Sequence, residues 1–193
     1  MKKALSLFLA SALLMPCLAA CTESKNELPN TVIIDVKDYG KITVELYPDM
    51  APITVENFKK LVNEGFYDGL IFHRVIENFM IQGGCPDGNG TGGKTDKNGN
   101  KITIKGEFTS NGVKNTLMHT RGVISMARSY FPNTASSQFF ICHKDAPHLD
   151  GDYAAFGKVT EGIEVVDAIA AVDTNGNDKP LVDVVINSIT FAE

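Results

Sequence analysis

Two segments of the sequence decide the fold: residues 72–84 read FHRVIENFMIQGG, and residues 137–142 read SQFFIC. Both contain short runs of β-branched and aromatic residues, which are typical of β-strands. In an extended run successive side chains point to opposite faces, so Arg74 shares one face with Phe72 and Ile76. These segments and the two residues before the first of them therefore predict short strands at residues 70–75, 79–82 and 138–142, the first of which carries Arg74.

Further β-rich runs lie on both sides of these segments. Residues 31–36 and 42–46 flank a DYG sequence and predict a hairpin, and three more runs follow at residues 122–126, 155–159 and 182–191. Two stretches instead have helical spacing, one that begins at Pro52 and stops at Gly65, and one around residues 163–170.

Many short strands with only two helices predict a mainly antiparallel sheet. Closure into a barrel would remove the edges that such strands otherwise expose, and the helices would then cover its open ends. Residues 83–116 are rich in Gly, Asn, Asp and Lys and show little periodicity. A segment of this length inside a compact domain is usually functional.

Short motifs follow one another through this region in a fixed order. They are FHRVI (72–76), FMIQGG (79–84), NGTGG (89–93), GVISMA (122–127), SQFFI (137–141), LDG (149–151) and FGKV (156–159). In order and spacing the sequence resembles the cyclophilin family from about Thr31 to Glu193. The resemblance implies a closed eight-stranded antiparallel β-barrel capped by two α-helices, and peptidyl-prolyl cis-trans isomerase activity.

The resemblance also implies the site. Carried over position by position, it makes Arg74 the catalytic arginine, with Gln82 beside it on a neighbouring strand. It assigns the substrate-binding contacts to Phe79, Met80, Ala127, Gln138, Phe140, Leu149 and Tyr153. The first two of these, with Phe140 and Leu149, would surround the proline ring, whereas Gln138 and the backbone near Ala127 would line the substrate groove.

These residue types suit prolyl isomerisation on chemical grounds. Rotation about a peptide C–N bond costs about 18–20 kcal/mol because resonance must be broken. No bond is made or cut, so the reaction needs no nucleophile, metal or cofactor. A dry apolar cup for the ring and a fixed guanidinium that prefers the twisted amide would suffice. Gln82, with two donors and an acceptor, can hold a substrate carbonyl and Arg74 together.

The sequence departs from the best-known eukaryotic cyclophilins at three positions. His148 stands where they carry a tryptophan, Arg128 replaces an asparagine, and Tyr153 replaces a histidine at the pocket rim. Because Tyr153 keeps a ring and a hydroxyl donor, we expect catalysis to survive.

The N-terminus has the order of a secretory signal peptide. Two lysines precede an apolar run at residues 4–14, and Leu18-Ala19-Ala20-Cys21 resembles the bacterial lipobox. We therefore expect a signal peptide at residues 1–20, a lipidated Cys21 with a polar tether at residues 21–29, and the isomerase domain at residues 30–193. The mature protein would be a membrane-anchored, extracytoplasmic lipoprotein, but the sequence does not say which membrane holds it.

Composition limits the partners. Processing would remove two lysines and no acids, so the formal charge would change from −5 to −7. An acidic domain does not suit nucleic acid, which favours a basic face. We expect a monomer that binds proline-containing polypeptides, with assistance to the folding of exported proteins as its role.

Several alternatives remain open at this point. Cys85 and Cys142 can be buried thiols or can form a disulfide, and the sequence does not decide between them. Residues 173–178 lack the spacing of a calcium loop and are interpreted as a polar turn, and the histidines lack zinc spacing.

The rival to an enzyme is a cyclophilin barrel that acts as a chaperone or scaffold, for which Arg74 would be unnecessary.

Overall fold

The structure is a computed structural model that describes residues 28–192. The expected signal peptide and Cys21 lie outside the described residues. Among the described residues, no helix has the length and apolar character needed to cross a membrane.

Eight strands form the main body of the fold. They are β1 (Thr31–Val36), β2 (Gly40–Leu46), β3 (Arg74–Ile76), β4 (Met80–Gly83), β5 (Val123–Met126), β6 (Phe139–Cys142), β7 (Ala155–Glu161) and β8 (Ile186–Phe191). They make one sheet in the order β3-β4-β6-β5-β7-β2-β1-β8, and every pair in it is antiparallel. The predicted mainly antiparallel sheet of eight strands is confirmed.

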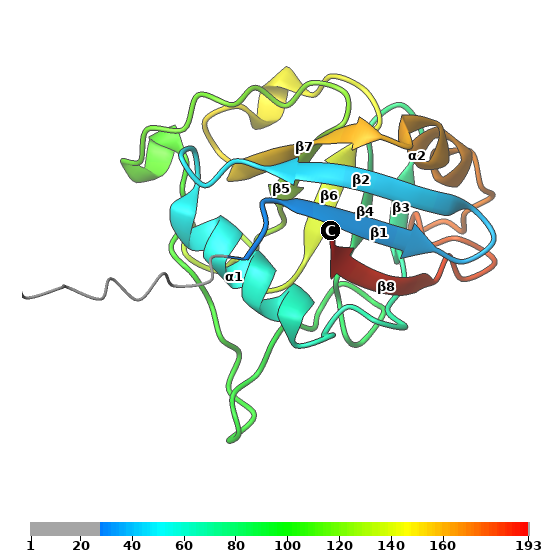
Figure 1. Ribbon diagram of the computed structural model, residues 1–193, viewed down its shortest axis with the longest axis horizontal. Coiled ribbons are helices and arrows are strands. Elements are labelled where there is room, and N and C mark those ends of the chain that lie inside the picture. Colours follow the sequence, from blue (N-terminus) through cyan, green and yellow to red (C-terminus); the bar gives the residue numbers. More distant parts are fainter. Residues whose placement is uncertain (1–27, 193) are drawn as a thin grey trace, which may run out of the picture.

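The sheet is strongly curled, so that its two edge strands approach each other (Figure 1). No continuous ladder joins β3 to β8 in the described chain. Instead, Phe72 N–H donates to the Val184 carbonyl at 2.9 Å, Gly69 N–H donates to the Ile186 carbonyl at 2.8 Å, and Ile71 forms an isolated bridge. The two edges of the curled sheet are therefore joined along this seam by separate bonds rather than by a strand ladder.

The same seam explains two strands that are shorter than their sequences predict. Residues 70–73 and 182–185 belong to β-rich runs, yet they lie outside β3 and β8. They meet each other across the seam, where a few separate hydrogen bonds replace a regular ladder.

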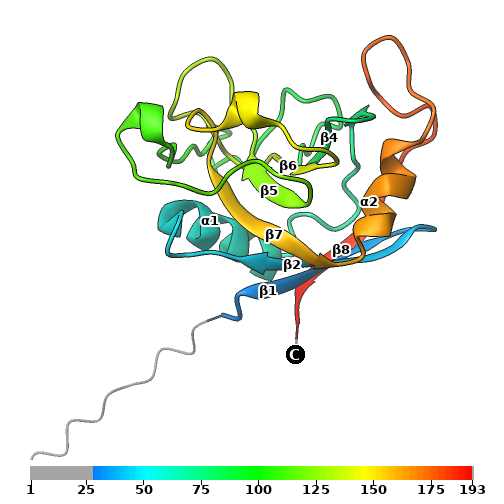
Figure 2. The same ribbon diagram turned by 90° about the horizontal axis from the view of Figure 1, so that it is seen from above.

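Two helices lie at opposite ends of the curled sheet (Figure 2). They are α1 (Pro52–Asn63) and α2 (Ile163–Ala170), and each buries an apolar face against the core. The first turn of α1 has no local side-chain cap. Its free N–H groups are satisfied by the distant Glu107, whose carboxylate accepts from Ile53 N at 3.1 Å and from Thr54 N at 2.7 Å.

The core fills the inside of the curled sheet. Phe139 of β6 is fully buried there, and its ring packs edge-on against Phe58, Tyr67 and Phe72 at centroid distances of 5.5–6.1 Å. A second, smaller apolar cluster lies on the other face of the same strands, around Met80, Phe140 and Leu149.

Candidate active site

Strands β3, β4 and β6 place the candidate residues on the outer face of the sheet. Arg74 faces Gln82 across β3 and β4, and Gln82 in turn faces Phe140 across β4 and β6. Because side chains alternate along a strand, these residues and Met80 share the outer face, whereas Phe139 points into the core. The predicted meeting of Arg74 and Gln82 on neighbouring strands is confirmed.

The strand arrangement depends on a close approach at the end of β4. Gly84 has a φ of +81°, and a Cβ atom there would lie 2.5 Å from the Ser137 carbonyl oxygen. Only glycine fits at this position. The turn after β4 can therefore bring the segment that follows it against the start of β6.

The second apolar cluster forms a small cup. Its cavity has a volume of about 140 Å³, several times the ~30 Å³ that one water molecule occupies in the liquid. Nine residues line it: Arg74, Phe79, Met80, Gln82, Ala127, Arg128, Phe140, Leu149 and Tyr153. Of the catalytic and substrate-binding residues that we expected, only Gln138 is absent from this set.

The wall and floor of the cup are well packed. Met80, Phe140 and Leu149 are buried, and the half-buried Phe79 and Tyr153 pack against them. Tyr153 meets Phe140 edge-on at 6.0 Å between ring centroids. The cup thus has an apolar wall, with the polar side chains of Arg74, Gln82 and Arg128 also in its lining, and a ring of modest size can enter it.

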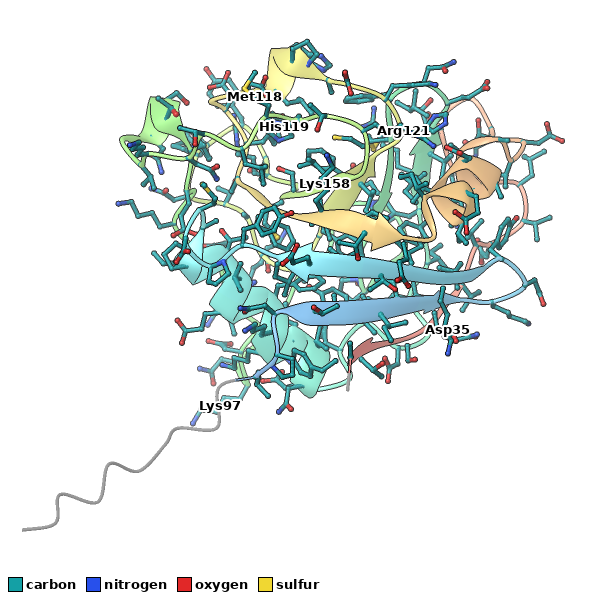
Figure 3. The ribbon with its side chains drawn as sticks, turned by 45° about the horizontal axis from the view of Figure 1, so that its top comes forward. Asp35, Lys97, Met118, His119, Arg121 and Lys158 are labelled. Carbon is teal, nitrogen blue, oxygen red and sulfur yellow. The ribbon has the colours of Figure 1, made fainter. Side chains whose placement is uncertain are left out.

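A buried histidine supports the cup from behind. His119 precedes β5, close to the short 3₁₀ turn η2 (Pro147–Leu149) (Figure 3). Its ring stacks on Phe140 at 6.0 Å between centroids, its Nδ1 lies 2.9 Å from Asp150 Oδ1, and its Nε2 lies 3.0 Å from Ser125 Oγ. Burial lowers the pKa of His119, although the hydrogen bond to Asp150 opposes this shift. A neutral ring that donates through Nδ1 and accepts through Nε2 satisfies both partners.

Sequence reasoning missed the role of His119. It considered this residue only as a metal ligand, and no signal in the sequence joins His119 to Asp150, which lies 31 residues further along the chain.

Arg128 separates the cup from a second pocket. Its guanidinium lies 4.6 Å from the Tyr153 ring centroid and 5.2 Å from that of Phe108, and its Nε donates to the Asp152 carbonyl at 2.9 Å. The second pocket has a volume of about 260 Å³ and shares Gln82, Ala127 and Arg128 with the cup. The two recesses therefore adjoin, and together they are called the groove.

Gln138 lies in this second pocket, where we expected it to line the groove. Its Nε2 donates to the carbonyls of Gly90 and Gly92 at 2.8 and 2.7 Å, which turns its Oε1 toward Gln82. Gln82 Nε2 donates to that oxygen at 2.9 Å.

The expected hydrogen bond between Gln82 and Arg74 is absent: the Gln82 Nε2 donates to Gln138, and the Arg74 Nε donates to a different residue. Arg74 instead donates from Nε to Asp178 Oδ2 at 3.3 Å. Arg74 and Gln82 thus reach the groove from adjacent positions, but each is held by a separate partner.

The remaining groups do not form a competing centre. Cys85 and Cys142 are both buried free thiols, and burial raises the pKa of Cys142 to about 12. Residues 28–192 bring no three His, Cys, Asp or Glu side chains together in a way that could hold a metal ion.

A larger hollow of about 560 Å³ lies along α1. Its lining contains no arginine, histidine or cysteine, and its Lys59 Nζ is held by the Leu28 carbonyl and Asn30 Oδ1. The smaller cup is therefore the better candidate for chemistry.

Comparison with known proteins agrees with this geometry. The family described as "Cyclophilin type peptidyl-prolyl cis-trans isomerase/CLD" matches residues 31–191. Peptidyl-prolyl cis-trans isomerase B of Bacillus subtilis is 53% identical over 129 residues, which cover 67% of this chain and 82% of the relative. Peptidyl-prolyl cis-trans isomerase CYP18-1 of Arabidopsis thaliana is 43% identical over 153 residues, which cover 79% and 90% of the two chains.

A solved structure shows the same fold. The crystal structure of a cyclophilin type peptidyl-prolyl cis-trans isomerase from Cryptosporidium parvum, determined in the presence of the dipeptide Ala-Pro, superposes with a TM-score of 0.75 at 33% identity. The superposition covers 84% of this chain and 99% of that one.

Proposed function

Since the chain belongs to the cyclophilin-type peptidyl-prolyl cis-trans isomerase family and is an enzyme of that activity, we propose that it accelerates X-Pro bond rotation in exported proteins, from a lipid anchor at Cys21. Arg74 is the catalytic residue of this proposal, and the apolar cup holds the proline ring.

The observation that carries this assignment is the apolar cup with a guanidinium at its rim. When the X-Pro bond twists, the prolyl nitrogen loses resonance and regains a lone pair. Arg74 is always charged and can donate to that nitrogen, so its interaction is stronger in the twisted state than in either planar isomer. Preference for the twisted amide lowers the barrier without any covalent step.

The groove beside the cup supplies contacts for the substrate backbone. Ala127 lines both the cup and the second pocket, and its N–H donates to the Gln138 carbonyl at 3.0 Å, which fixes the backbone at this edge of the groove. Gln82 and Gln138 hold each other and present fixed amides to the same peptide. A rigid groove of this kind orients an extended chain while the proline ring stays fixed.

The isomerase part of the proposal is tested with short Ala-Pro peptides. A protease-coupled or NMR exchange assay should show faster cis-trans exchange with the protein than without it. Exchange at the uncatalysed rate would overturn the assignment.

The exported location is supported by the sequence of the N-terminus, where a lysine pair, an apolar run and a Leu-Ala-Ala-Cys sequence follow one another. Cys21→Ser should abolish incorporation of radioactive palmitate and leave the precursor uncleaved by the lipoprotein peptidase. Cys17→Ser is the matched control, because Cys17 follows Pro16 and lacks the small residues of a lipobox. Labelling that persists in Cys21→Ser and is lost in Cys17→Ser would place the anchor at the other cysteine.

One observation favours a second candidate function, a chaperone that binds unfolded segments. Tyr130 and Phe131 are 89% and 68% exposed, and their rings pack edge-on at 5.4 Å between centroids. They stand in the loop between Arg128 and Thr134, both of which line the second pocket. If binding alone were the function, an Arg74→Ala protein would still suppress the aggregation of an unfolded substrate protein as well as the unaltered protein does.

A further inference from the structure

The polar turn between α2 and β8, which sequence reasoning left without a function, holds the side chain of Arg74. Asp178 Oδ2 accepts from Arg74 Nε at 3.3 Å, across a sequence separation of 104 residues. Both side chains are 42% exposed, so the pair lies at the open side of the cup rather than in the core.

The backbone fixes Asp178 at this place. The Val75 N–H donates to the Asp178 carbonyl at 2.8 Å, which joins the turn to β3 at the residue next to Arg74. Asp178 has a φ of +62°, in the left-handed region that Gly, Asn and Asp adopt most readily.

The turn itself is ordered by Asn175. Asn175 Oδ1 accepts from Asn177 N at 2.9 Å and from Lys179 N at 3.1 Å, while the Asp178 N–H donates to the Asn175 carbonyl at 3.0 Å. This small network sets the direction of the carboxylate before any substrate arrives.

The contact leaves the reactive part of Arg74 free. A guanidinium has five N–H donors in a rigid plane, of which Nε carries one. Within residues 28–192 the Arg74 side chain makes this single hydrogen bond, so its two terminal NH₂ groups remain available to a substrate. Fixing the plane at Nε fixes the direction in which the terminal groups point, and catalysis by a donor depends on that direction.

We propose that Asp178 is a positioning residue for the isomerase reaction: it does not touch the substrate, but it holds the Arg74 guanidinium in the orientation that donates to the twisted prolyl amide. The inference rests on the proposed function, in which Arg74 is the catalytic residue.

The first test removes the carboxylate without straining the turn. Asp178→Gly keeps a residue that tolerates the φ of +62°, so the backbone bond to Val75 is preserved. The kcat for an Ala-Pro peptide should fall only roughly fivefold, because an exposed ion pair holds the guanidinium weakly. The KM should stay within about twofold. Asp178→Asn keeps an oxygen acceptor and should recover at least half of the lost kcat.

The matched control is Asp183→Gly. Asp183 lies in the same connection and pairs with Lys179 at 3.5 Å, so its replacement removes the same charge without touching Arg74. This variant should keep the kcat of the unaltered protein. A loss of kcat equal to that of Asp178→Gly would mean that any change of charge in the connection has the effect, and the positioning role would be wrong.

The decisive measurement is a double-mutant cycle with Arg74→Ala. If Asp178 acts through Arg74, Asp178→Gly should cause no further loss in the Arg74→Ala background. An equal loss in both backgrounds, or full kcat in Asp178→Gly alone, would overturn the inference. Full activity of Arg74→Ala alone would instead refute the proposed role of Arg74, so the two failures are distinguishable.

Discussion

Strands β4 and β6 are apolar on both faces, and the two faces serve different purposes. On the inner face, Ile81, Phe139 and Ile141 are fully buried in the main core. On the outer face, Met80 and Phe140 belong to the small cluster that lines the cup. Neighbouring residues of one strand thus pack against the protein on one side and face the substrate groove on the other.

The comparison shows how an apolar run without alternation should be interpreted. A strand with one solvated face alternates between apolar and polar residues, so a run such as FFIC must have an apolar partner on each side. Here one partner is the main core, and the other is the small cluster that includes Ala146 and Leu149 and forms the wall of the cup. The inner face should therefore govern stability and the outer face catalysis, and substitutions at adjacent positions should separate the two.

The largest effect is expected on the inner face. Phe139→Ala should lower the free energy of unfolding by about 3–5 kcal/mol, because its ring is fully buried among Phe58, Tyr67 and Phe72. Urea unfolding measures this change, and Phe139→Leu should cost much less because it leaves a smaller cavity. A loss below about 1 kcal/mol for Phe139→Ala would remove the distinction between the two faces.

The next effect concerns Arg74, whose side chain lies at the rim of the cup. Arg74→Ala should lower kcat/KM for an Ala-Pro peptide roughly a hundredfold, as the loss of one transition-state donor typically does. The circular dichroism spectrum and the urea midpoint should be close to those of the unaltered protein, since the side chain is 42% exposed.

Arg121→Ala is the control for this experiment. Arg121 is also partly exposed, but its two terminal nitrogens bind Asp167 on α2, away from the cup. It should retain full activity. Full activity in Arg74→Ala would exclude the guanidinium from the mechanism.

A smaller effect is expected on the wall of the cup. Phe140→Ala should lower kcat/KM about tenfold, mostly through a higher KM, because the proline ring loses an apolar wall. Its cost in stability should be about 2 kcal/mol, less than that of Phe139→Ala, since one side of the ring faces the cavity rather than the core. An unchanged kcat/KM would mean that the proline ring binds elsewhere.

The features that the sequence predicts are those carried by local pattern and motif order. The β-rich runs, the two helices and the residues that line the cup all follow from contiguous segments, and the structure brings the predicted residues Phe79, Met80, Phe140, Leu149 and Tyr153 together. Strand propensity is local, however, whereas a ladder is a tertiary property. This is why residues 70–73 and 182–185 were expected in strands but form only separate bonds at the seam.

The side-chain partners could not be predicted for the same reason. Gln82 binds Gln138 and Arg74 binds Asp178, and these pairs are 56 and 104 residues apart in the sequence. Several acceptors were available to each side chain, and only the folded backbone selects one of them. The place of Arg74 in the lining of the cup was therefore predictable, but the partner of its side chain was not.

The smallest expected effect concerns pH and the support behind the outer face. Burial lowers the pKa of His119 in the folded protein, whereas the unfolded chain has the ordinary value of about 6.5. Below pH 6.5 the unfolded chain therefore takes up a proton at His119 more readily than the folded protein does. The stability that the neutral ring provides is complete above pH 6.5 and is lost as the pH falls through 6.5 toward the lowered folded pKa.

The urea midpoint of the protein should accordingly be lower at pH 5.5 than at pH 7.5. His119→Asn should show a lower midpoint at both values but a smaller difference between them. Part of the difference will remain in every variant, because burial also lowers the pKa of His73. The effect is small because burial and the hydrogen bond to Asp150 shift the pKa of His119 in opposite directions. If the midpoints of His119→Asn differ between the two pH values as much as those of the unaltered protein, the His119 ring does not contribute to the loss of stability at low pH.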